Sequence, residues 1–182
     1  EVISNIEMEI GMIPDSISGA ADDDEDMAIA DKSLRHQFIL FALEGNFFAL
    51  PLSSALEVGH RPAITPLPQL PKWILGISNI RGEIISIVNL KIFFGIPSTG
   101  TKGEGRFIII YNQNMKTGII VDEIPGILSL DRIDADIQNS PYRHGEILKY
   151  ISGVSVSGDR LINILDTDRL LTSRRLKKLS EV

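Results

Sequence analysis

Two short stretches of this chain are near copies of each other: residues 84–89 read IISIVN and residues 161–166 read LINILD. Each copy runs into a short helical start with two adjacent large apolar residues, Phe93–Phe94 in the first and Leu170–Leu171 in the second. A run that recurs together with its downstream neighbours indicates an internal repeat, and a repeat decides the architecture before any single motif does.

The repeat extends well beyond these two stretches. The other matching pairs are Phe38–Phe41 with Phe107–Ile110, Ala49–Leu52 with Gly118–Val121, and Gly76–Ser78 with Gly153–Ser155. Short apolar runs can recur by chance, but here the pairs keep the same order in both halves. The preserved order predicts two related units in tandem.

Short apolar runs separated by turn residues begin after His36, and such runs predict β-strands. The predicted strands are 38–43, 47–52, 74–80, 84–88, 106–111, 117–122, 147–156 and 160–165. Turns such as Glu44–Asn46 join them closely and leave little room for helices. We therefore predict a mainly β fold made of small antiparallel barrels rather than a parallel sheet.

The repeat places one barrel at roughly residues 36–100 and the other at roughly 105–165, with the glycine-rich segment 100–105 between them as a linker. A C-terminal helix is predicted over 166–179, with Asp166 as its N-cap. Four basic residues crowd its last turns: Arg174, Arg175, Lys177 and Lys178. The helix dipole and solvation explain these cations, although they could also touch nucleic acid or an acidic membrane.

The first 34 residues differ in composition from the rest. Residues 1–31 carry ten acidic side chains and no basic one, whereas the remainder holds 14 acidic and 18 basic residues, a net charge of +4. The run Asp22–Asp26 would repel itself in any compact state. Because it lacks the alternating ligands and closing Glu of a calcium loop, we interpret residues 1–34 as a flexible acidic tail.

The chain shows no pattern of catalytic or ligand-binding residues. It has no cysteine, which excludes disulfides, a thiol nucleophile and any zinc site built on Cys. Its histidines, His36, His60 and His144, are not spaced as metal ligands. No glycine-rich loop ends in Gly-Lys-Ser or Gly-Lys-Thr. We predict that the protein is not an enzyme and has no cofactor and no metal site.

The segment Gly76–Ile85 places polar residues at the tip of an otherwise apolar hairpin. Gly82 can supply the positive φ of a tight turn, which puts Arg81 at the second turn position, pointing outward. Asn79 can hydrogen-bond nearby backbone and brace the tip. An outward arginine on a rigid turn is either a recognition device for carboxylates and carbonyls or a solvated turn residue.

This hairpin belongs to a longer ordered set of motifs. The set comprises Phe38–Leu50, Ala55–Val58, Thr65–Pro71, Gly76–Leu90 with its Asn79-x-Arg81-Gly82 signature, Val121–Ile124, Tyr150–Val154 and Gly158–Leu161. Together these motifs resemble the CheW-like family over about residues 36–172. The resemblance implies two five-stranded, SH3-like barrels and a non-catalytic adaptor, which couples methyl-accepting chemoreceptors to a CheA-type histidine kinase in bacterial chemotaxis or related motility signalling.

The resemblance also implies two sets of interaction residues. The receptor-binding set is Leu52, Ala55, Glu57, Val58, Asn79 and Arg81, and the kinase-binding set is Gly82, Ile84 and Tyr142. The receptor surface is expected to be an apolar groove between the barrels, where Arg81 and Glu57 orient the partner through charge-assisted hydrogen bonds. Tyr142 is expected to be an exposed aromatic contact in the second barrel.

Two residues depart from the family pattern: Ser86 stands where Pro is usual, and Asn89 where Asp is usual. Neither change is expected to disrupt the fold, and both are compatible with a diverged paralogue. An alternative is a CheW-like regulatory domain excised from a larger kinase or response-regulator-fused chain.

No apolar run approaches the ~20 residues that span a bilayer, and no signal peptide opens the chain. We expect a cytoplasmic protein that joins membrane receptor arrays through partners, without binding nucleic acid.

Overall fold

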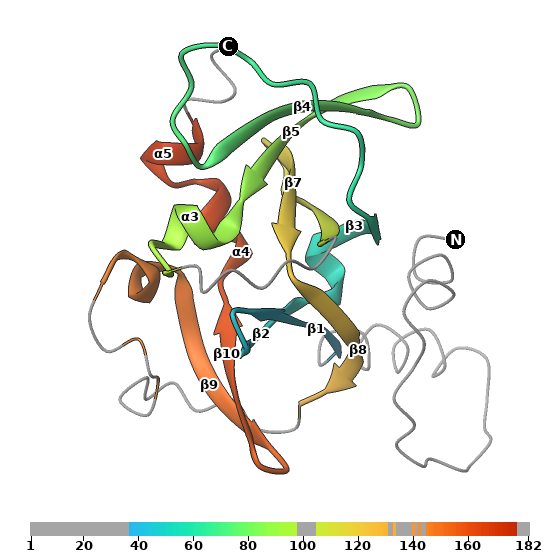
Figure 1. Cartoon of the computed structure of the whole chain (residues 1–182). Helices are drawn as coiled ribbons and strands as arrows, with labels where there is room; N and C mark the ends of the chain where they lie inside the picture. Colours follow the sequence, from blue (N-terminus) through green and yellow to red (C-terminus); the bar gives the residue numbers. More distant parts are fainter. Residues whose placement is uncertain are drawn as a thin grey trace, which may run out of the picture.

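The computed structural model describes residues 37–97, 105–130, 133, 140, 142 and 145–177. The predicted tail, 1–34, and most of the predicted linker lie outside these residues. Within them, ten strands form two five-stranded sheets joined by a few short helices (Figure 1). The prediction of a mainly β fold with two five-stranded, SH3-like units is confirmed.

The two sheets each have a mixed strand order. Sheet A holds, in spatial order, β8 (Glu123–Ser129), β1 (Gln37–Leu43), β2 (Asn46–Pro51), β10 (Arg160–Leu165) and β9 (Ile151–Ser157). Sheet B holds β3 (Ala55–His60), β6 (Arg106–Tyr111), β7 (Lys116–Val121), β5 (Glu83–Asn89) and β4 (Ile74–Ile80). The helices are η1 (Leu52–Ser54), α3 (Leu90–Phe94), η3 (Glu146–Tyr150), α4 (Thr167–Leu171) and α5 (Arg174–Lys177).

The predicted repeat is visible in the strand pairing, where β1–β5 of the first copy correspond to β6–β10 of the second. In the antiparallel ladders, Leu40 pairs with Ala49 just as Ile109 pairs with Gly118. In the parallel ladders, Ile164 pairs with Ala49 just as Ile87 pairs with Gly118. Consistent with this correspondence, the β4–β5 and β9–β10 hairpins project from opposite ends of the molecule (Figure 1).

The predicted barrel boundaries do not coincide with the sheets, because the two repeats exchange strands. Sheet A combines β1 and β2 of the first copy with β8, β9 and β10 of the second, and sheet B combines the complementary strands. The chain leaves sheet A at η1 and returns to it at Asp122. The exchange also creates one parallel ladder in each sheet, which the expectation of antiparallel barrels did not include.

Both faces of the central strands are buried, which explains their nearly continuous apolar sequences. On β1, Ile39 and Phe41 join a large cluster that draws residues from both sheets, whereas Phe38 and Leu40 join a smaller cluster confined to sheet A. On β6, Ile108 and Ile110 join the shared cluster, and Phe107 and Ile109 join a cluster confined to sheet B. The shared cluster therefore fills the space between the two sheets.

The two departures from the family pattern fit the fold. Asn89 caps α3, because its Oδ1 accepts a hydrogen bond from the Ile92 N–H at 3.1 Å. Asp166 caps α4 in the same way through the Arg169 N–H at 2.9 Å. Ser86 lies opposite Ile77 within the β4–β5 ladder, where proline could not donate a backbone hydrogen bond.

Three local predictions need correction. The single helix predicted over 166–179 is divided into α4 and α5, because the Thr172 hydroxyl donates a hydrogen bond to the Asp168 carbonyl at 2.6 Å where the first helix ends. The first part of the strand predicted at 147–156 is the 3-10 helix η3. Two strands were not predicted, β3 and β8. β8 contains Pro125, which is tolerated because β8 is an edge strand.

A cluster of three ionised side chains, Glu44, Lys91 and Asp122, lies where the chain returns from sheet B to sheet A. Lys91 Nζ lies 2.7 Å from Asp122 Oδ1 and 2.8 Å from Glu44 Oε1, and the Glu44 side chain is only 5% exposed. The Glu44 N–H also donates to Asp122 Oδ2 at 2.7 Å. Desolvation lowers the pKa of Lys91, but the hydrogen bonds and charges of Asp122 and Glu44 outweigh it and raise that pKa above 10.5.

Lys91→Met should lower the free energy of unfolding by about 2 kcal/mol, because it removes the ammonium that lies 2.8 Å from the buried Glu44 carboxylate. Lys116→Met is the matched control: its ion pair with Glu83 is more exposed, at 32% and 57% of the two side chains, and its loss should cost under about 1 kcal/mol. Urea unfolding measures both.

The stabilisation by Lys91 should be full below pH 10.5 and lost as the pH rises through the higher pKa of the folded protein. Equal destabilisation by Lys91→Met and Lys116→Met would contradict the role given to this ion cluster.

Candidate functional site

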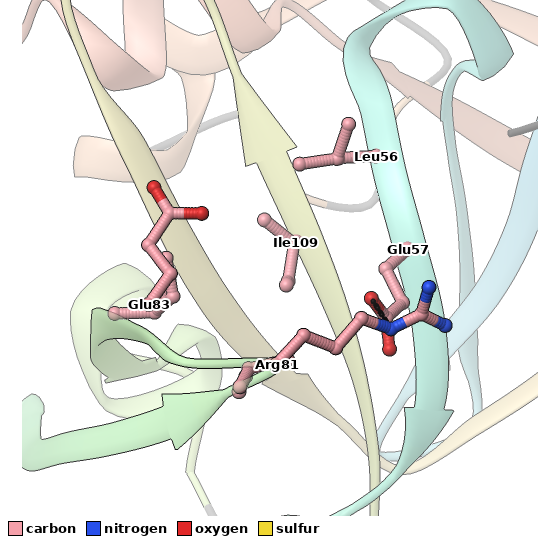
Figure 2. Close-up of a pocket in the computed structure, with 7 residues that line it drawn as sticks. Leu56, Glu57, Arg81, Glu83 and Ile109 are labelled. Carbon is pink, nitrogen blue, oxygen red and sulfur yellow. Dashed lines mark ion pairs between the residues drawn. The ribbon is translucent and has the colours of Figure 1, made fainter.

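Sheet B carries a pocket of about 230 Å³ between the tip of the β4–β5 hairpin and strand β3 (Figure 2). Its apolar lining comes from Leu56, Ile80, Ile85 and Ile109, and its charged lining from Glu57, Arg81 and Glu83. A concave apolar surface bordered by a few polar groups is the usual form of a binding site.

The hairpin tip is a two-residue turn in which both central residues have positive φ, 54° at Arg81 and 86° at Gly82. This is the turn conformation whose twist matches that of the flanking strands. Asn79 Oδ1 accepts a hydrogen bond from the Gly82 N–H at 2.8 Å, as the sequence predicted. The positive φ of Arg81 was not predicted, and it contributes to the direction in which the side chain leaves the turn.

Arg81 pairs with Glu57 across the mouth of the pocket. Arg81 Nε lies 3.1 Å from Glu57 Oε2, and the side chains are 67% and 22% exposed (Figure 2). Such an exposed pair contributes little to stability. It leaves most of the arginine in contact with solvent, so the guanidinium can meet a partner's carboxylate or carbonyl.

A β-bulge places two neighbouring residues of β3 in the pocket. In the β3–β6 ladder, Ala55 pairs with Ile110 and Glu57 pairs with Ile109, so Leu56 is the extra residue. The bulge interrupts the alternation of side chains between the two faces of a strand. Consequently Leu56 and Glu57 both line the pocket.

A second ion pair borders the pocket from β5 and β7. Lys116 Nζ lies 2.8 Å from both carboxylate oxygens of Glu83. At the equivalent positions of sheet A, Arg160 stacks over the ring of Phe47 at 4.8 Å. The two repeats therefore match in their backbones but differ in the chemistry of this surface.

Three predicted receptor-binding residues lie in the shared core. Leu52, Ala55 and Val58 are 3%, 4% and 6% exposed and belong to the cluster between the sheets. The expected groove between the barrels is thus occupied by core side chains. The structure brings Glu57, Asn79 and Arg81 together at the hairpin tip instead. The sequence did not predict five residues of the pocket lining: Leu56, Ile80, Glu83, Ile85 and Ile109. For Leu56 the reason is the bulge that brings it into the pocket, which leaves no mark in the sequence.

The three predicted kinase-binding residues differ in their exposure to solvent. Gly82 and Ile84 are exposed on the hairpin, with Ile84 61% exposed. Tyr142, expected to be an exposed contact, is half-buried, and its ring packs 5.6 Å from the ring of Phe48. Its hydroxyl is buried and has no hydrogen-bond partner within the described part of the chain. Burial raises the pKa of Tyr142 to about 12.

Tyr142→Phe should leave the free energy of unfolding unchanged or raise it by about 1 kcal/mol at neutral pH, because it removes a buried hydroxyl without a partner. The wild type should lose stability relative to this variant between pH 10 and about 12, because the unfolded chain releases the tyrosine proton first. Urea unfolding across this range checks it, and parallel pH profiles for the two proteins would contradict it.

The described residues also bear on metal binding and on membrane insertion. No group of three or more His, Asp or Glu side chains there could hold a metal ion. No helix there has the length and apolar character to cross a bilayer.

The exchanged five-stranded sheets, with a pocket at one hairpin tip, define a small two-sheet β protein. A family model described as the CheW-like domain matches residues 37–175. The chain belongs to this family.

Known relatives agree with this assignment. The chemotaxis protein CheW of Treponema pallidum is 29% identical over 161 residues, which cover 86% of this chain and 92% of that protein. The protein PilI of Pseudomonas aeruginosa is 29% identical over 114 residues, covering 63% of this chain and 64% of PilI. The crystal structure of the scaffolding protein TtCheW from Thermoanaerobacter tengcongensis has a TM-score of 0.63 at 28% identity, covering 72% of this chain and 88% of that one.

Proposed function

We propose that this protein is a non-catalytic adaptor that couples methyl-accepting chemoreceptors to a CheA-type histidine kinase, in chemotaxis or a related motility pathway. The observation that carries the proposal is the Arg81–Glu57 pair beside an apolar pocket, on a turn braced by Asn79, in a chain of the CheW-like family. The adaptor would act in the cytoplasm and reach membrane receptor arrays through its partners.

The pocket suits an aliphatic side chain presented by a partner helix. Leu56, Ile85 and Ile109 offer it an apolar surface, from which water is displaced on binding. The exposed guanidinium of Arg81 would then fix the orientation of the helix through a charge-assisted hydrogen bond. At many protein interfaces an apolar side chain anchors the partner while a polar side chain sets its orientation.

The hairpin offers separate surfaces to two partners. Successive residues of a strand point to opposite faces, so Ile85 lines the pocket while Ile84 is exposed on the other side. We assign the pocket face to the receptor and the Ile84 face, with Gly82, to the kinase.

Arg81→Ala should weaken binding of the receptor's cytoplasmic fragment by roughly 10- to 100-fold, as loss of a hydrogen bond to a charged group does. The melting temperature should barely change. Arg169→Ala is the matched control, because Arg169 pairs with Asp166 at 3.0 Å with similar exposures of 62% and 24%. Isothermal titration calorimetry measures the affinities, and equal affinities for the two variants would refute the role of Arg81.

Leu56→Asp should reduce receptor binding but leave kinase binding intact, whereas Ile84→Asp should do the reverse. Leu56→Asp puts a charge in the pocket and Ile84→Asp puts one on the opposite face of the hairpin, and burying either charge against a partner is costly. Co-purification of the adaptor with each partner separately checks this, and loss of both partners in both folded variants would show that the faces are not separate.

A further inference from the structure

Tyr111, the last residue of β6, is an exposed aromatic residue on the pocket face of sheet B. Along β6, Phe107 and Ile109 belong to the apolar cluster on this face, whereas Ile108 and Ile110 belong to the shared core. The register of β6 with β7 is uninterrupted as far as Tyr111. Because side chains alternate along a strand, Tyr111 lies on the same face as Ile109, one step beyond the pocket.

The strand pairing supports this position of Tyr111. Tyr111 is paired with Lys116 of β7, so the two side chains leave the sheet on the same side. Lys116 Nζ lies 2.8 Å from both carboxylate oxygens of Glu83, and Glu83 lines the pocket. Tyr111 therefore lies beside the ion pair that borders the pocket.

In the described part of the chain, the Tyr111 side chain has no polar partner and no place in the core. It is 39% exposed and belongs to none of the three apolar clusters. Among the described residues its hydroxyl makes no hydrogen bond, and no aromatic ring or cation stacks on its ring. Tyrosines are enriched among the residues that contribute most to binding at protein interfaces, because they combine a large apolar ring with a polar tip.

Two ion pairs border the pocket on opposite sides, across the direction of the strands. The Arg81–Glu57 pair is on the β3 side and the Lys116–Glu83 pair on the β5 side, and Figure 2 shows Glu57 and Glu83 on either side of Ile109. The more exposed member is the cation in the first pair, with Arg81 67% exposed, and the anion in the second, with Glu83 57% exposed. A helix between these pairs would run along the strands and meet opposite charges on its two flanks.

The apolar surface of the pocket continues along β6 toward Tyr111. In the other direction along β6, Phe107 is only 5% exposed, and Ile64 and Leu75 pack against the same cluster. A partner that extends beyond the pocket along β6 would therefore meet Tyr111.

We propose that Tyr111 is a second contact for the receptor helix held at the pocket, and that this helix lies along β6. The inference rests on the receptor-binding function proposed for the pocket. Ile109 and Tyr111 are about 6.4–6.8 Å apart along the strand, close to the ~6 Å rise between residues i and i+4 of an α-helix. An apolar residue at position i would fill the pocket, and one at i+4 would pack on the Tyr111 ring.

Tyr111→Ala in the full chain should weaken binding of the receptor's cytoplasmic fragment by roughly 10-fold, as truncation of an aromatic interface residue does. Tyr111→Phe should bind within roughly two-fold of the wild type, because it keeps the ring. Val156→Ala is the matched control: Val156 is 69% exposed on the β9–β10 hairpin, at the opposite end of the molecule (Figure 1), and its loss should leave the affinity unchanged. Isothermal titration calorimetry measures the affinities, and circular dichroism verifies folding.

Double-mutant cycles determine the direction of the helix. Apolar residues of the receptor fragment are replaced by Ala one at a time, and each is measured with Leu56→Ala and with Tyr111→Ala. Coupling is expected between groups in contact. The receptor residue coupled to Tyr111 should lie in the same helix as the residue coupled to Leu56, four positions away.

The outcomes distinguish this contact from the function on which it rests. Weaker binding by Arg81→Ala with unchanged binding by Tyr111→Ala would leave the receptor function standing and overturn the contact at Tyr111. Coupling of Leu56 and Tyr111 to different helices, or to residues of one helix at another spacing, would overturn the direction of the helix. Failure of the wild-type protein to bind the receptor fragment would overturn both the function and the contact.

Discussion

The structure depends on burying one apolar cluster between two sheets, neither of which can form from a single repeat. Sheet A needs β1 and β2 from the first half and β8 to β10 from the second, and both sheets contribute side chains to the shared cluster. Phe41, Phe48 and Ile108 are completely buried there. The exchange explains why the central strands are apolar on both faces, and why the two halves should fold as one cooperative unit.

Because the core is shared, functional differences between the repeats are confined to the surface. The register makes Gly126 the sheet A equivalent of Glu57, and Gly158 the equivalent of Arg81. Glycines cannot form an ion pair, so the β9–β10 hairpin lacks the charged pair that distinguishes the β4–β5 hairpin. The β4–β5 hairpin therefore carries the Arg81–Glu57 ion pair, whereas the β9–β10 hairpin shares only its backbone pairing.

Much of this architecture was predictable because it follows from local patterns. The strands at 74–80, 106–111 and 160–165 have the predicted bounds, since apolar runs between turns fix them. The brace from Asn79 to the Gly82 amide was also predictable, because it depends on residues three positions apart. Strand exchange was not, because the repeat shows which strands are related and not which strands pair.

The site was predicted less well than the fold, for reasons that are also physical. The motif includes Glu57, Asn79 and Arg81, which the structure brings together, but it could not tell surface from core at Leu52, Ala55 and Val58. That distinction depends on the bulge in β3 and on the partner sheet, which are properties of long-range pairing. Tyr142 likewise became half-buried through Phe48, a residue 94 positions earlier in the chain.

We propose that the tip of the β4–β5 hairpin and the bulged strand β3 together hold a helix of the receptor. Hydrogen–deuterium exchange of this protein with and without the receptor's cytoplasmic fragment tests it most directly. Bound receptor should slow exchange at the amides of Leu56, Glu57 and residues 80–85, and should leave exchange in β9 and β10 unchanged. Slowed exchange confined to sheet A, with none at the hairpin tip, would contradict it.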